Sequence, residues 1–80
     1  MKYKFKAKIQ LKDGIIDPEV KTITKVMQRS GYKISNLKFL KEAIFEIDAN
    51  SKEEALNIAN HIVDDSLANP ILEKYNIILL

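Results

Sequence analysis

The chain has 80 residues, 46% of them apolar, and a net charge of +2, which suits one globular domain with a small core. It has no cysteine and one histidine, which excludes disulfides, thiolate metal sites and His-rich metal sites. No apolar run is long enough for a transmembrane helix or a signal peptide. We therefore expect a cytoplasmic protein with a single domain over residues 1–80, stabilised in part by oligomerisation.

Charge is divided unevenly along the chain. Residues 1–41 carry eleven basic and three acidic side chains, a net charge of +8. Residues 42–80 carry two basic and eight acidic side chains, a net charge of −6. Such asymmetry is typical of nucleic-acid binders and of proteins with charge-complementary partners, although it also cancels when two halves fold together.

Residues 2–12 alternate between apolar and polar side chains, which predicts a half-buried strand. One face carries Tyr3, Phe5, Ala7, Ile9 and Leu11, and the other carries Lys2, Lys4, Lys6, Lys8, Gln10 and Lys12. Asp13-Gly14 ends the strand. A helix then begins at Asp17-Pro18, because aspartate caps free N–H groups and proline suits the first helical position. Its apolar residues are Val20, Ile23, Val26 and Met27, and Gly31 suits its C-terminal end.

The second half of the chain predicts two strands, a helix and a last strand. The strands cover residues 34–40 and 43–49, with a turn near Lys41-Glu42. Ser51 and Glu54 form a capping box, in which Glu54 reaches back to the N–H of Ser51. The helix that begins after Ser51 ends before Asn69-Pro70, because proline disfavours a helical residue ahead of it. The last strand covers residues 75–80.

The order β-α-β-β-α-β predicts an α+β, two-layer, ferredoxin-like domain. In this arrangement two helices cover one face of a four-stranded antiparallel sheet. The lysine row then lies on the free face, where Glu46 and Asp48 of the neighbouring strand can pair with Lys4 and Lys6. We favour this ion-paired face over a polyanion site, because the aromatic residues of the first strand lie on its other side.

No catalytic, cofactor-binding or metal site is predicted. His61 has Asp64 and Asp65 three and four residues further on, but no third ligand or nucleophile joins them. The chain lacks a phosphate-binding glycine loop. The last strand is apolar on both faces, which is typical of a strand buried on both sides. Burial against a second copy of the chain would cover it, so we predict a homo-oligomer.

Several local patterns together resemble the PurS family, a subunit of phosphoribosylformylglycinamidine (FGAM) synthase. They are Asp17-Pro18, Ser30-Gly31-Tyr32, Lys41, the segment 51–55 and the segment 67–75, L-A-N-P-I-L-E-K-Y, which is the most specific. The chain departs from the family pattern at Val20 and Leu40, where glycine is usual.

The resemblance implies an accessory subunit of an ATP-dependent C–N ligase, with no catalytic residues of its own. Such a subunit forms a homodimer or tetramer and joins a PurQ glutaminase to a PurL synthetase, supporting ammonia transfer from glutamine in purine biosynthesis. It binds no cofactor itself, whereas the complex uses ATP and Mg²⁺. The candidate assembly residues are Lys41, Asn69, Pro70, Tyr75, Ile78 and Leu80.

A different class with the same element order is a regulatory module that binds a small effector between protomers. Such modules have a glycine-bearing loop after the first strand, and Asp13-Gly14 is in that place. We expect neither a nucleic acid nor a membrane as a partner. A nucleic-acid binder would lose affinity steeply with salt, because counterions return to the phosphates.

Overall fold

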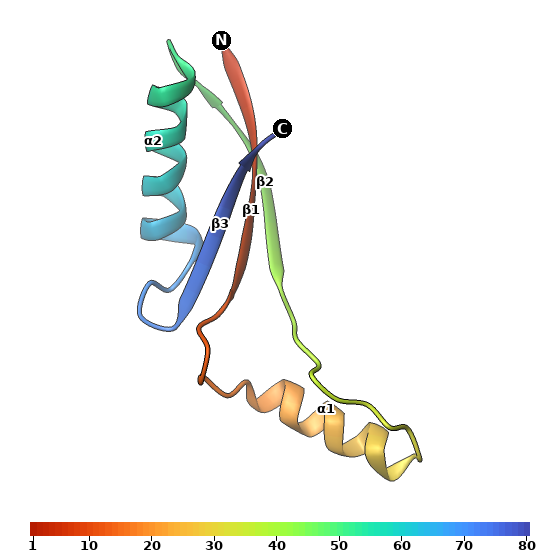
Figure 1. The fold of residues 1–80 in the computed structure, drawn as a ribbon. Helices are drawn as coiled ribbons and strands as arrows, with labels where there is room; N and C mark the ends of the chain where they lie inside the picture. Colours follow the sequence, from red (N-terminus) through yellow and green to blue (C-terminus); the bar gives the residue numbers. More distant parts are fainter.

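The computed structural model describes all 80 residues. The elements follow in the order β1 (Lys2–Leu11), α1 (Pro18–Arg29), β2 (Lys41–Asp48), α2 (Lys52–Ile62), the π-helical turn η1 (Val63–Leu67) and β3 (Glu73–Leu79). The strands form one antiparallel sheet in the order β2-β1-β3, with α2 against one face (Figure 1). The predicted α+β class and antiparallel sheet are confirmed.

Two parts of the predicted architecture are wrong. Residues 34–40 form no strand, so the sheet has three strands rather than four. The reason is that the pairing of β1 with β2 ends at Ile9 and Lys41, and β1 itself ends two residues later at Leu11, so most of residues 34–40 have no strand beside them. Lys41 itself begins β2 and does not lie in a turn.

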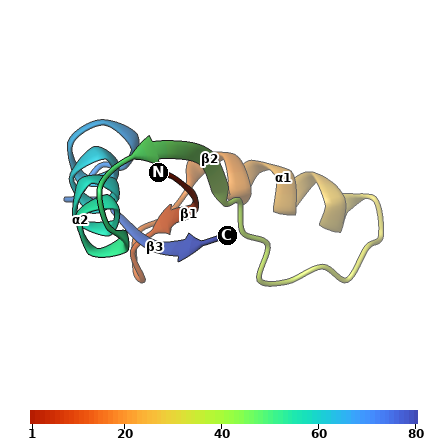
Figure 2. The ribbon, with the colours of Figure 1, turned by 90° about the horizontal axis from the view of Figure 1, so that it is seen from above.

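The first helix also lies elsewhere than predicted. None of its residues is buried, and it projects beyond the end of the sheet instead of covering it (Figures 1 and 2). Only α2 covers the sheet. The molecule therefore has two parts, which we call the sheet lobe (residues 1–11 and 41–80) and the projecting lobe (residues 12–40).

The division into lobes gives the chain an elongated shape. Its principal extents are 54 × 23 × 15 Å and its radius of gyration is 16.6 Å. A compact domain of this length has a radius of gyration of about 12 Å. No helix is long and apolar enough to span a membrane.

The core lies between α2 and the inner face of the sheet. Phe5, Ala7 and Ile9 of β1 are buried, as the alternation predicts. The helix side of the core contains Ala55 and Ala59, whose small side chains allow α2 to lie close to the sheet. The rings of Phe5 and Phe45 stack with centroids 5.9 Å apart. The sheet lobe therefore contains the whole buried core.

The register of β1 and β2 confirms one predicted cross-strand pair and corrects another. Lys4 lies opposite Glu46, as expected. Asp48 lies opposite Lys2 instead of Lys6, because in an antiparallel ladder the residue two after Glu46 pairs with the residue two before Lys4. The carboxylate of Asp48 forms its ion pair with the amino group of Met1, at 3.2 Å.

Local signals define α1 even though it is not packed on the sheet. Asp17 caps the helix by accepting a hydrogen bond from the Glu19 N–H at 2.9 Å, and Pro18 is its first residue. At the other end Gly31 has a positive φ of 93°. There the N–H groups of Gly31 and Tyr32 donate to the carbonyls of Gln28 and Met27, which satisfies the last turn.

The capping box of α2 forms with one change of partner. Ser51 accepts a hydrogen bond from the Glu54 N–H at 3.1 Å, as predicted. The Glu54 carboxylate reaches the N–H of Asn50, one residue before the cap, at 3.4 Å. The helix continues into η1, which buries Val63 and stops before Asn69-Pro70.

Candidate assembly surface

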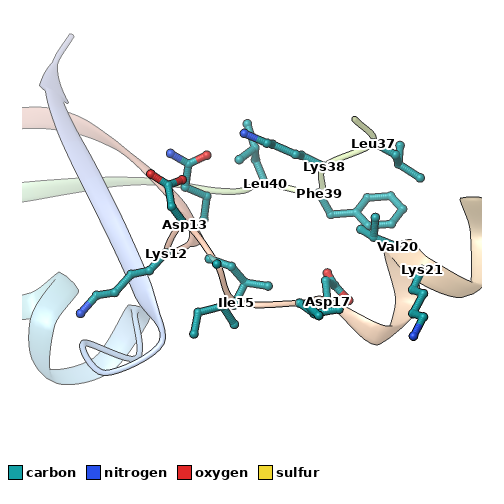
Figure 3. A pocket seen from close by; sticks show the side chains of 14 residues that line it. Lys12, Asp13, Ile15, Asp17, Val20, Lys21, Leu37, Lys38, Phe39 and Leu40 are labelled. Atoms are coloured by element: carbon teal, nitrogen blue, oxygen red, sulfur yellow. The ribbon is translucent and has the colours of Figure 1, made fainter. Parts of the chain in front are cut away.

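The projecting lobe exposes an apolar stripe along α1. Val26 is 54% exposed and Met27 is 36% exposed, although both belong to the apolar side of the helix. The other two apolar residues, Val20 and Ile23, are half-buried. The arm formed by residues 33–40 runs back from α1 to β2 (Figure 2), and its Phe39 side chain points toward Val20 of this stripe (Figure 3).

A pocket of about 340 Å³ lies at the elbow where the two lobes meet. The connection from β1 to α1 forms one wall, and residues 37–40 of the arm form the other (Figure 3). Phe39 points toward Val20 across this pocket, while Ile15 lies nearer the sheet. Lys12 and Asp17 add polar groups at the edges.

The open face of the sheet combines the lysine row with exposed apolar side chains. Ile44 and Ile78 lie on either side of Lys6 in the register and are 58% and 43% exposed. Leu80 follows the end of β3 and is 57% exposed. This face is not covered by any other part of the chain, and on β3 it carries Lys74 and Asn76 as well as Ile78.

The segment before β3 forms a tight turn around Asn69. The Asn69 side-chain Oδ1 accepts a hydrogen bond from the Ile71 N–H at 3.0 Å. Its carbonyl accepts from the N–H groups of Leu72 and Glu73, at 3.2 and 2.7 Å. Pro70 is exposed within the turn, which directs the chain from η1 into β3.

Glu73 links this turn to β2. Its Oε1 accepts a hydrogen bond from the Asn69 N–H at 2.8 Å, and its Oε2 lies 3.1 Å from Lys41 Nζ. The Glu73 side chain is only 14% exposed, against 61% for Lys41. The Asn69 hydrogen bond, with help from Lys41 and against the effect of burial, lowers the pKa of Glu73 below its ordinary value.

Tyr75 belongs to the inner face of the sheet. It packs against the small cluster of Ala7, Ile9 and Val63, so it supports the core from β3. Burial raises the pKa of Tyr75 above its ordinary value, and the carboxylate of Asp64 raises this pKa further.

The structure brings together only part of the predicted assembly set. Lys41, Asn69 and Pro70 meet at the turn before β3, through Glu73. The remaining three lie apart from this turn: Tyr75 faces the core, whereas Ile78 and Leu80 lie two residues apart near the far end of β3.

Sequence reasoning missed two participants. Glu73 lies within the segment 67–75 and four residues after Asn69, a spacing that allows its carboxylate to bond the Asn69 N–H. Ile44 belongs to the predicted strand 43–49 and shares the open face with Glu46 and Asp48, but it was not singled out. Around His61, as elsewhere in the chain, no group of three or more metal-ligating side chains is present.

These features define a small α+β subunit with an unpartnered apolar stripe, an apolar elbow pocket and an open sheet face. The family model for PurS, phosphoribosylformylglycinamidine (FGAM) synthase, matches residues 4–80. The chain therefore belongs to the PurS family, and its function is that of the PurS subunit of FGAM synthase, in purine biosynthesis.

Individual relatives agree with this assignment. The PurS subunit of phosphoribosylformylglycinamidine synthase from Archaeoglobus fulgidus is 34% identical over 71 residues, which is 88% of this chain and 89% of that protein. The PurS subunit from Thermotoga maritima is 29% identical over 76 residues, with 94% and 93% covered. A chain in the solved structure of PurLQS from Thermotoga maritima is similar with a TM-score of 0.85 and 28% identity, covering 100% of this chain and 99% of that one.

Proposed function

We propose that this chain is the non-catalytic assembly subunit of its FGAM synthase, a homo-oligomer that joins a PurQ glutaminase to a PurL synthetase. The similar chain from Thermotoga maritima occurs in a structure of PurLQS, which supports these two partners. A cytoplasmic location belongs to the same proposal.

The projecting lobe is the observation that carries the proposal. An isolated helix of 12 residues is marginal in water, and here α1 has no buried residue. Its exposed stripe, the elbow pocket and the exposed Ile78 would all be covered by association with a second copy. A surface of this kind serves contacts between proteins and leaves the chemistry to the partners.

The reaction gives a reason for such a subunit. Ammonia released from glutamine would be protonated and lost in bulk water, so the two active sites must be held together and shielded. An oligomer of fixed geometry sets their separation. In this proposal the partner subunits bind the ATP and Mg²⁺, and this chain binds no cofactor.

The test is FGAM synthesis by the two partner enzymes, with and without this chain. We expect the chain to raise the glutamine-driven rate and to leave the ammonium-driven rate unchanged. Equal effects on both rates would show that it activates the synthetase directly. No effect on either rate would contradict the proposal.

The elbow pocket favours one second candidate, a module that binds a small effector. Asp13 and Gly14 line the pocket, which places the glycine-bearing loop where an effector would bind. Calorimetry against amino acids and nucleotides distinguishes the two functions. Heat that saturates with one compound, and disappears when Phe39 is replaced by alanine, would favour the effector site.

A further inference from the structure

We infer that the segment leading into β3, Leu72–Lys74, is the anchor that fixes the angle of the projecting lobe. This role explains what the turn at Asn69 does physically. The angle of the projecting lobe can be measured on this chain without the partner enzymes. Its consequence for enzyme coupling rests on the proposed function, because the lobe is the part offered for assembly.

Two irregular segments, residues 12–17 and 33–40, connect the projecting lobe to the sheet lobe. No backbone–backbone hydrogen bond involves residues 33–40, and the connection from β1 has a single turn, with the Ile15 N–H bonded to the Lys12 carbonyl. Each residue of such a segment keeps two soft dihedral angles. The polar contacts that limit the direction of the lobe are therefore those at the two places where these connections leave the sheet, which we call its roots.

Three consecutive residues hold both roots. The Leu72 carbonyl accepts a hydrogen bond from the Lys12 N–H at 2.9 Å, which extends the β1–β3 pairing by one step. Lys74 Nζ lies 3.5 Å from the Asp13 carboxylate at the same root. Glu73 reaches across β1 to Lys41, the residue at which the arm becomes β2, at 3.1 Å.

The Glu73 contact is the one most able to fix an angle. Ion pairs between fully exposed side chains contribute little, because both partners move and water screens them. Here the carboxylate is 14% exposed and is also held by the Asn69 N–H at 2.8 Å, so it presents Lys41 with a fixed partner. The pair between Lys74 and Asp13 is weaker, since Asp13 is 90% exposed.

The geometry of the lobe amplifies any change at the roots. The 12 residues of α1 extend about 18 Å, and the arm returns along the same direction. A small rotation at Lys41 therefore moves the far end of α1 by several ångströms. An interface that needs both lobes in register would be sensitive to that rotation.

The experiment measures the distance between spin labels on the two lobes. Because the chain has no cysteine, Lys25→Cys on α1 and Glu53→Cys on α2 give two unique labelling sites. Labelled chain is diluted with excess unlabelled chain, so that only distances within one copy are recorded. We expect one narrow distance distribution for this labelled form.

The anchor is then broken at either partner. Glu73→Gln keeps an acceptor for the Asn69 N–H but removes the charge, and Lys41→Met removes the charge while keeping an unbranched side chain of similar size. We expect each single variant to broaden the distance distribution and the double variant to broaden it no further. Lys41→Arg, which keeps the positive charge, should retain the narrow distribution. Asp48→Asn is the matched control, because it removes the ion pair at the other end of β2.

Two results would overturn the inference. One is an unchanged distribution in both Glu73→Gln and Lys41→Met. The other is equal broadening in Asp48→Asn, which would indicate general loosening of the sheet. If Glu73→Gln fails to fold, Lys41→Met decides, since Lys41 is largely exposed. Neither result depends on the glutaminase or the synthetase, so failure here is separate from failure of the proposed function.

Discussion

In the sheet lobe, the inner apolar face of each strand is covered by α2, and all eight buried residues of the chain lie there. In the projecting lobe, the apolar stripe of α1 is covered only in part. Both lobes use the same local signals, an N-cap before the helix and apolar residues at helical spacing. The difference shows that these signals define a helix but leave open which surface covers it.

The largest expected effect is loss of the sheet-lobe core. Phe5 is fully buried and stacks on Phe45, so Phe5→Ala should lower the free energy of unfolding by about 3–5 kcal/mol. Urea denaturation followed by circular dichroism measures this change. A loss below 1 kcal/mol would mean that the sheet lobe is not the stabilising unit.

The matching change in the projecting lobe should affect association instead of folding. Burial of Val26 by a second copy would contribute about 2 kcal/mol. We therefore expect Val26→Asp to weaken self-association by roughly 30-fold, as measured by sedimentation velocity.

Lys25→Asp is the control for this change, because it places the same side chain on the polar side of α1. It should leave the sedimentation profile unchanged. Equal dissociation by both variants would indicate that the helix, and not its stripe, is affected.

A smaller effect is expected where the two lobes meet. Asn69→Ala removes the acceptor of the Ile71 N–H, a loss of about 1 kcal/mol in the turn. We expect a lower glutamine-driven rate at limiting concentration of this chain, with the ammonium-driven rate intact. Pro70→Ala should act in the same direction. A wild-type glutamine-driven rate and affinity in both variants would contradict the role of this turn in assembly.

The N-caps of α1 and α2 allow a matched comparison between the lobes, with expected effects of similar size. Ser51→Ala and Asp17→Ala each remove a capping hydrogen bond that contributes about 1 kcal/mol. Hydrogen exchange should show that Ser51→Ala lowers protection throughout the sheet lobe. In Asp17→Ala only the amides of α1 should lose protection. Loss of sheet protection in Asp17→Ala would show that the lobes fold as one unit.

The smallest expected effect is on the stability of the fold at acidic pH. The pKa of Glu73 is lowered in the folded chain, so its carboxylate stabilises the fold above the ordinary glutamate pKa. This contribution is lost as the pH falls through the lowered pKa. Urea midpoints between neutral and acidic pH should therefore fall less in Glu73→Gln than in the unmodified chain. Glu42→Gln, which changes a glutamate without an ion pair, should follow the unmodified chain.

Local elements could be predicted from the sequence with good accuracy. The alternation over residues 2–11, the caps at Asp17 and Ser51, and the break before Asn69-Pro70 all depend on neighbours in the sequence. The error at residues 34–40 has a different origin. Their composition favours a strand, but a strand needs a partner, and β1 ends at Leu11, so most of these residues have no strand beside them.

The contacts of the candidate assembly surface also divide into local ones, which the sequence indicates, and distant ones, which it does not. Asn69 acts within its own turn, and the resemblance to a family was enough to single it out. The link from Glu73 to Lys41 joins residues 32 positions apart, across an intervening strand. No periodicity or spacing in the sequence indicates such a contact, so only the three-dimensional arrangement shows it.

The projection of one lobe also separates charge in space. Residues 12–40 contain six basic and three acidic side chains, a net charge of +3, whereas the sheet lobe contains seven basic and eight acidic side chains, a net charge of −1. These two lobes lie toward opposite ends of a molecule 54 Å long (Figure 1). The chain is thus an electric dipole, which turns in the field of an approaching charged protein before contact. At low ionic strength this pre-orientation raises the fraction of encounters that begin with the correct end.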